Sequence, residues 1–236
     1  ETVKLMAPEI ENIDSESFKT KQKIGENNKK ICQFIQNDSI DDFIIYVTKE
    51  NIPLSITIEP SIFETNLFLL KNKPTLIEYA AFYGSIQIFQ YLKLNSAEMT
   101  SRLWLYVIHG KNPDLIHILE ENNVQPPNNN FIECYKESIK CHHIDIMNYF
   151  KNNFIAKCDD ENFSISASIQ FYNFINFCDT YNNTDFHISN DNKLNIFYQF
   201  CKYDYIDIVD FLLKNNTFEL NSKIVCKIIY LIKFQN

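Results

Sequence analysis

The sequence predicts an all-α fold in which pairs of short helices stack as an α-solenoid. Three observations support this prediction: apolar residues recur at helical spacing, a helix–turn–helix pattern returns along the chain, and glycine is scarce. Only three glycines occur among 236 residues, and the many Ile, Phe and Leu residues beside them argue against a hairpin-rich β protein. With 45% hydrophobic residues, the chain can also fill a sizeable core.

The clearest helix pair is encoded by residues 74–92. Thr75 is placed to cap a first helix, and Gly84 supplies the left-handed residue that ends it. The apolar face of the first helix contains Ile77, Ala80 and Ala81, and the two alanines leave room for another helix to approach closely. The second helix has apolar residues at Ile88, Phe89 and Leu92. Because a pair this short cannot bury its own apolar face, it needs neighbouring pairs on both sides.

The segments before this pair are less regular. Residues 1–27 are expected to form a polar arm or one loosely docked helix, and an earlier pair is expected from Asn28 to about residue 47. Between residues 48 and 72 the spacing breaks. A helix is expected to begin at Pro60–Ser61 and to run through Leu70, and we interpret it as one inserted helix.

Weaker copies of the pair follow. Equivalent positions of the second helices hold Phe43, Ile88, Leu115, Ile146 and Ile208. The intervals between them are 45, 27, 31 and 62 residues, and the last is twice 31, so we expect a further copy centred on Phe177. Its turn would place Asn173 in the left-handed position that Gly84 holds. The same position in the other copies is assigned to Ser39, Lys111 (with Gly110 as the alternative), His142 and Asp204.

The repeat pattern resembles a known family. A period of 31–33 residues, with Thr-x-x-x-x-Ala-Ala-x-x-Gly and then Ile-x-x-x-Leu, resembles the ankyrin repeat. More narrowly, residues 59–66, 74–89 and 109–112 resemble the ankyrin-related domain of large protist families. The resemblance implies an α-solenoid of stacked ankyrin-type helix pairs. It divides the chain into an N-terminal arm (1–27), a repeat region (28–221), and the start of a further repeat or a C-terminal helix (222–236).

The resemblance also implies a function. Ankyrin-type arrays are non-catalytic scaffolds that bind proteins through a concave face, formed by turns and by exposed positions of the first helices. In this sequence those positions are Tyr79, Tyr83, Tyr106, Glu137, Gln199 and Tyr203. Tyrosine suits such a role because it offers a large contact area with a polar group. Two alternatives remain open: a structural spacer within a larger protein, and an enzyme with a site dispersed over several helices.

No catalytic residue, cofactor or metal is predicted. The sequence contains no nucleophile elbow, no P-loop and no His-Glu-x-x-His motif. The sharpest cluster of zinc-ligand residue types is Cys134, Cys141, His142 and His143. Its spacing matches no common zinc finger, so packing and a turn are the favoured interpretation. Trp104 and Cys201 are both expected in the core.

Charge and cysteine usage limit the partners. A net charge of -8 disfavours nucleic acid, and no uninterrupted apolar run is long enough to span a bilayer, so the predicted partner is an unidentified protein. Seven cysteines, an odd number, indicate reduced thiols in the cytosol or nucleus, and we predict a cytoplasmic location. The segment 224–232 is too apolar for a solvated end, so we expect either continuation of the chain or self-association through it.

Overall fold

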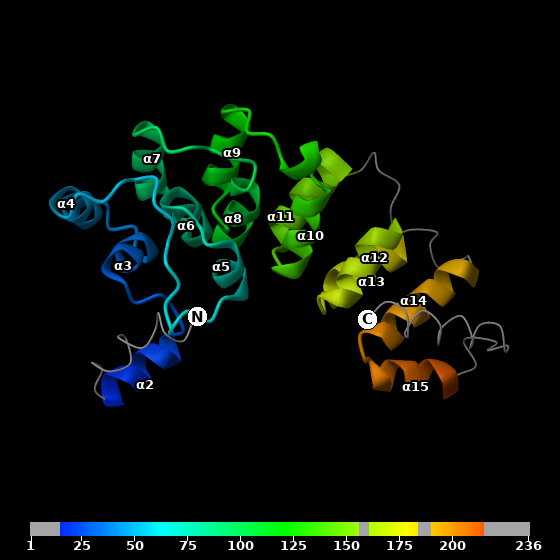
Figure 1. Cartoon of the computed structure of the whole chain (residues 1–236). Coiled ribbons are helices and arrows are strands. Elements are labelled where there is room, and N and C mark those ends of the chain that lie inside the picture. Colours follow the sequence, from blue (N-terminus) through cyan, green and yellow to red (C-terminus); the bar gives the residue numbers. More distant parts are fainter. Residues whose placement is uncertain (1–14, 156–160, 184–189, 215–236) are drawn as a thin grey trace. The chain divides into compact units, whose positions relative to one another are not determined.

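The computed structural model describes residues 15–155, 161–183 and 190–214, and their regular secondary structure is helical (Figure 1). A single antiparallel bridge joins Thr57 to Thr75. The predicted all-α class is therefore confirmed. The chain divides into two compact units, unit 1 (Glu1–Asn130) and unit 2 (Phe131–Asn236), and this boundary falls inside the predicted repeat region. The C-terminal segment 222–236 lies outside the described residues.

Unit 1 is built from consecutive pairs of short helices, preceded by α2 (Ser15–Ile24) in the region predicted as an arm or one helix. The three pairs are α3 (Lys30–Gln36) with α4 (Ile40–Lys49), α6 (Leu76–Tyr83) with α7 (Ile86–Leu94), and α8 (Leu103–Gly110) with α9 (Pro113–Glu121). A 3-10 turn, Pro127–Asn129, follows the last pair. α6 packs against both α3 and α8, so the first helices of successive pairs lie side by side.

The inserted helix of unit 1 is α5 (Leu67–Asn72), and it begins later than predicted. The expected start at Pro60–Ser61 is wrong because Asn66 caps the helix: its Oδ1 accepts hydrogen bonds from the backbone N–H groups of Phe68 at 2.9 Å and Leu69 at 3.3 Å. Residues 60–66 form a loop with a turn at residues 62–63 instead, and the Thr65 hydroxyl ties this loop to the α2–α3 junction by donating to the Gly25 carbonyl at 2.9 Å.

Unit 2 repeats the same organisation. Its pairs are α10 (Ile132–Lys140) with α11 (Ile144–Phe150), α12 (Glu161–Gln170) with α13 (Phe174–Asn183), and α14 (Asn190–Lys202) with α15 (Ile206–Lys214). A π-helical turn, Lys151–Ile155, continues α11. The further helix pair predicted around residue 177 is confirmed as α12 and α13. Across the described residues of both units, no helix combines the length and hydropathy needed to cross a membrane.

One residue with positive φ separates the helices of each pair. These residues are Asp38 (48°), Gly84 (70°), Lys111 (53°), His142 (57°), Tyr172 (58°) and Asp204 (57°). Four of the six match the predicted positions. Ser39 and Asn173 were each predicted one residue too late, because both begin the second helix; the Asn173 side chain accepts from the Asn176 N–H at 3.2 Å, as a helix cap does.

In several of the described helix pairs, the residue after the left-handed position ties its pair to the preceding one. In unit 1 the Ser85 hydroxyl donates to the Ile35 carbonyl. In unit 2 the Asn173 amide donates to the Ile139 carbonyl at 2.9 Å, and the Tyr205 hydroxyl donates to the Ile169 carbonyl at 2.6 Å. All three carbonyls lie three residues before the left-handed residue of their own pair. We call these bonds the cross-pair contacts, because the same link recurs at equivalent positions in both units.

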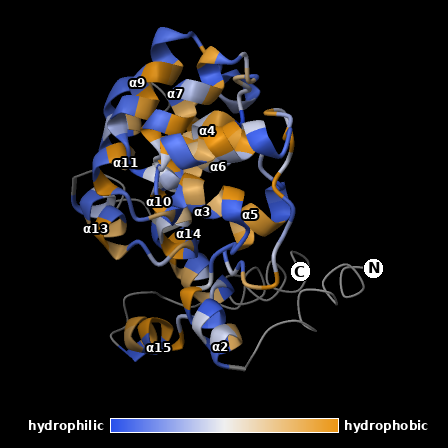
Figure 2. Cartoon of the chain, turned by 90° about the vertical axis from the view of Figure 1, so that its left-hand side faces the viewer, coloured by the Kyte–Doolittle hydropathy of each residue, from blue (hydrophilic) through white to orange (hydrophobic). Residues whose placement is uncertain are grey.

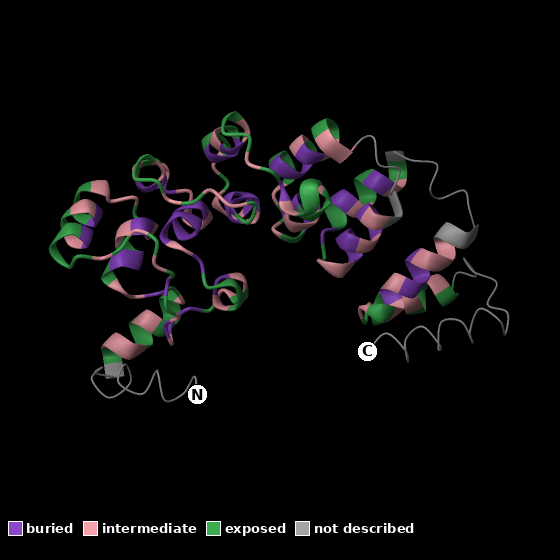
Figure 3. Ribbon diagram, turned by 45° about the horizontal axis from the view of Figure 1, so that its top comes forward, coloured by how far each residue is buried: buried purple, intermediate pink, exposed green. Residues whose placement is uncertain are grey.

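The backbones of α6 and α8 approach closely in the centre of unit 1, and both helices are buried over most of their length (Figure 3). A Cβ atom added to Gly110 would lie 2.3 Å from the Ala81 carbonyl oxygen, and one added to Gly84 would lie 2.7 Å from the Gly110 carbonyl oxygen. The predicted close approach at Ala80 and Ala81 is thus confirmed. The absence of a side chain at Gly110 permits this close approach, whereas Lys111 is the left-handed residue that ends α8.

The first helix of the clearest pair has a capping box. The Thr75 hydroxyl accepts from the Glu78 N–H at 3.4 Å, and the Glu78 carboxylate accepts from the Thr75 N–H at 2.9 Å. We expect Thr75→Ala to lower the free energy of unfolding of unit 1 by about 1 kcal/mol, because the Glu78 N–H loses its side-chain acceptor at the start of the helix. The fluorescence of Trp104, the only tryptophan of the chain and buried in unit 1, reports this unfolding.

The matched control for the capping box is Thr48→Ala, an exposed threonine in α4 of the same unit. Exposed substitutions away from caps change stability by less than about 0.5 kcal/mol. Equal effects of Thr75→Ala and Thr48→Ala in urea unfolding would contradict the role of the capping box.

Candidate functional site

Two of the predicted partner-binding residues, Tyr79 and Tyr106, are core residues. The prediction assumes that they are exposed, and this assumption is wrong, since each is only 1% exposed. The Tyr79 hydroxyl accepts from the Gln36 amide at 3.0 Å, and the Tyr106 hydroxyl accepts from the guanidinium of Arg102 at 3.0 Å. α6 is covered on two sides by α3 and α8, which leaves fewer exposed positions than a simple repeat pattern suggests.

The environment of these two rings agrees with a packing role. Burial raises the pKa of the Tyr106 hydroxyl to about 12, and the nearby Glu78 carboxylate acts in the same direction. Burial also raises the pKa of Tyr79 far above its ordinary value. Both hydroxyl groups therefore stay protonated at neutral pH. Each forms its hydrogen bond within the protein rather than with a partner.

The other four predicted residues are half-buried, so part of each side chain is accessible. In unit 1, the Tyr83 ring lies 4.9 Å from the Tyr79 ring, and burial raises the pKa of Tyr83 to about 12. In unit 2, the Gln199 amide donates to the Asn195 side chain at 3.4 Å, and the ammonium of Lys202 lies 5.4 Å from the Tyr203 ring centre. These residues remain candidates for a binding role within their own units.

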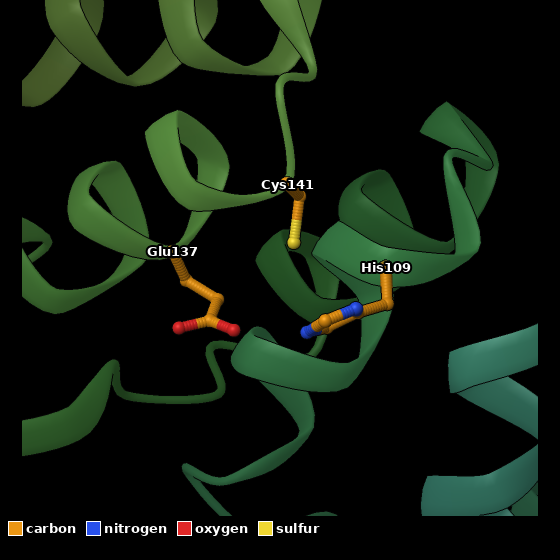
Figure 4. Close-up of side chains that lie close together, drawn as sticks. All are labelled: His109, Glu137 and Cys141. Atoms are coloured by element: carbon orange, nitrogen blue, oxygen red, sulfur yellow. The ribbon is translucent and has the colours of Figure 1, made fainter. Parts of the chain in front are cut away.

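Glu137, the remaining candidate, lies at the end of α10, one turn before Cys141, and the two side chains leave the same side of that helix (Figure 4). Glu137 forms an ion pair with Lys140 at 2.8 Å. The cysteine and histidine residues around it are held by different neighbours. Cys134 is fully buried, whereas the His142 ring contacts the Phe171 carbonyl at 2.9 Å. Packing and turn formation account for these contacts, as the sequence interpretation favours.

Unit 1 contains an aromatic cluster that the sequence analysis missed, formed by Phe68, Phe82, Tyr83 and His109. The His109 ring, at the end of α8, lies 4.4 Å from the Phe68 ring and 4.8 Å from the Phe82 ring. The Phe82 and Tyr83 ring centres are 5.1 Å apart. All four side chains are half-buried. A signal was present in the sequence, because Phe82 and His109 each lie two residues before the left-handed residue of their pair.

The cysteines of the described residues differ sharply in exposure, and this predicts their reactivity. Cys32 and Cys134 are fully buried, and burial raises the pKa of each thiol to about 12. Because the thiolate is the reactive form, iodoacetamide at pH 8 should label exposed Cys178 at least about 100-fold faster than these two. Peptide mass mapping measures the three rates. Equal rates without denaturant would contradict the buried placement, and labelling in urea provides the control.

Comparisons of the chain with protein-family models, with curated proteins and with solved structures found no match. The function is therefore inferred from the residues and contacts of this chain.

Proposed function

We propose that this chain is a non-catalytic scaffold of ankyrin-type helix pairs that binds a protein partner. The observation that carries the proposal is the recurrence of one structural unit: a first helix, a left-handed residue, and a second helix whose first side chain bonds to the preceding pair. Repeats joined in this way present adjacent turns and helix ends as one continuous surface, which is how stacked-repeat proteins bind their partners.

Within unit 1, the aromatic cluster is the best-supported contact surface. Aromatic side chains dominate the energetics of protein interfaces, because they bury a large area at a small cost in conformational entropy. The four side chains come from α5, α6 and α8, and the helices hold their rings in place through mutual contacts. The net charge of -8 favours a protein over a nucleic acid as the partner. The cytoplasmic location remains a prediction from cysteine usage.

The test is affinity capture from a native lysate with the parent chain and two variants. Phe82→Ser/Tyr83→Ser removes two rings of the aromatic cluster, whereas Ile45→Ser removes an apolar side chain of α4 that is 65% exposed and lies outside the cluster. We expect a stoichiometric protein that the parent and Ile45→Ser retain and that the double variant loses. Trp104 fluorescence must show that the double variant stays folded. Equal capture by all three chains would contradict the assignment of the surface.

A further inference from the structure

Unit 2 contains an apolar cavity of about 340 Å³ between α13, α14 and α15. Its walls include the aromatic residues Phe177 and Phe200, whose rings meet edge to face at 5.7 Å. Ile208 and Leu212 of α15 form the opposite wall. Only Ile196 and Phe200 among the lining residues are buried, so the cavity opens to the surface.

The rim of this cavity is unusually apolar for a surface. Phe174 is 39% exposed and Phe211 is 63% exposed, and Figure 2 shows that much of α15 is hydrophobic. Apolar surface of this kind, gathered around a concavity, marks a binding site more often than a simple exposed face does. The volume lies at the lower end of the range for small-molecule pockets, roughly 300–1,000 Å³.

The polar residues that line the cavity indicate which class of ligand it can bind. Among the described residues that line the cavity, Lys193 of α14 is the one charged residue, and Tyr181 and Cys178 are the other polar residues. Among the described residues, no carboxylate forms an ion pair with the Lys193 ammonium. An apolar wall with a single cation matches an aliphatic chain that carries one anionic group. The overall charge of -8 opposes an anion only weakly at physiological salt, because charges beyond about 8 Å are screened.

We propose that the cavity between α13, α14 and α15 binds an aliphatic monocarboxylate, with its chain against Phe177, Phe200 and Leu212 and its carboxylate toward Lys193. This activity is independent of the proposed protein-binding surface in unit 1. The site would make unit 2 a receptor for a fatty-acid-type ligand.

The test is isothermal titration calorimetry of the full chain with octanoate, nonanoate and decanoate, each below its micelle concentration. We expect saturable one-to-one binding that strengthens about fourfold per added methylene, because each methylene leaves water for an apolar wall. Decanoate should bind more tightly than 1-decanol, by up to about fivefold, as a partly exposed ion pair allows. Lack of saturable binding, or equal affinity for all three acids, would overturn the proposal.

Two pairs of variants test whether the carboxylate ligand binds in this cavity and whether its anionic group lies near Lys193. Leu212→Trp fills the cavity and should abolish binding, whereas Leu213→Trp changes the neighbouring residue, which does not line the cavity, and should preserve it. Lys193→Met should remove the preference for decanoate over 1-decanol, whereas Lys202→Met on the same helix should keep it. Binding that survives Leu212→Trp, or a preference that survives Lys193→Met, would overturn the proposal. Helical circular dichroism checks that each variant is folded.

Discussion

Gly110→Ala should destabilise unit 1 by about 2–3 kcal/mol, although alanine is the better helix former by about 1 kcal/mol. Gly110 is the last residue of α8 and does not occupy a left-handed conformation. The added Cβ would lie 2.3 Å from the Ala81 carbonyl oxygen and 2.9 Å from the Gly84 nitrogen. Both are backbone atoms, so the clash can be relieved only by moving α6 and α8 apart. Overpacking therefore outweighs helix propensity.

The neighbouring residue provides the matched control for this prediction. Lys111 has a φ of 53°, which is costly for a residue with a Cβ atom. Lys111→Gly should therefore stabilise unit 1 by up to about 1 kcal/mol, because glycine adopts the left-handed conformation without the steric cost of a Cβ atom. Urea unfolding followed by Trp104 fluorescence measures both variants. A destabilising Lys111→Gly would mean that the left-handed residue is Gly110, and a stabilising Gly110→Ala would mean that α6 and α8 do not approach closely; either result would contradict the structure.

Asn176→Asp should destabilise unit 2 by at least about 3 kcal/mol at pH 7, because it buries an unpaired charge. Asn176 is fully buried, and its amide donates to the hydroxyls of Ser164 at 3.1 Å and Ser168 at 2.7 Å. The Ser164 hydroxyl also contacts the Tyr135 hydroxyl at 2.9 Å. Asn176 Oδ1 has no hydrogen-bond partner in the described structure, so one carboxylate oxygen would be buried without a donor there.

The loss of stability caused by Asn176→Asp should increase with pH. Burial would raise the pKa of the new carboxyl group above its unfolded value of about 3.9, so the folded state would bind the proton more tightly. The stability difference from the parent should therefore be smallest near pH 4 and should grow as the pH rises through the folded pKa. Circular dichroism during urea unfolding measures it, with exposed Asn148→Asp as the control. A loss that does not change with pH would contradict the buried placement.

Much of the fold could be predicted because the local signals agree with the global structure. The Thr75 cap, the Gly84 turn and the hidden pair around residue 177 follow from helix chemistry and from spacing. The errors have a common origin. Asn173 can occupy a left-handed conformation or cap a helix, and composition does not separate these roles; the structure places the positive φ at Tyr172, and the Asn173 side chain accepts the capping bond from the Asn176 N–H. Likewise, Asn66 rather than Ser61 starts α5.

The candidate site was harder to predict because exposure depends on neighbours that the repeat pattern does not specify. Tyr79 occupies a position that is exposed in a simple array, but α3 and the side chain of Gln36 cover it here. The inserted helix α5 then brings Phe68 against Phe82 and His109. No periodicity predicts that contact, since α5 has no counterpart in the other pairs.

The cross-pair contacts are the central structural claim, and a series of alanine variants tests them most directly. Ser85→Ala in unit 1 and Asn173→Ala in unit 2 each remove a buried donor to a carbonyl of the preceding pair. Each should lower the free energy of unfolding by about 1–3 kcal/mol. The exposed controls, Asn95→Ala and Asn153→Ala, lose only a bond within their own segment and should change it by less than about 0.5 kcal/mol. Cross-pair variants as stable as these controls would contradict the stacking of successive helix pairs.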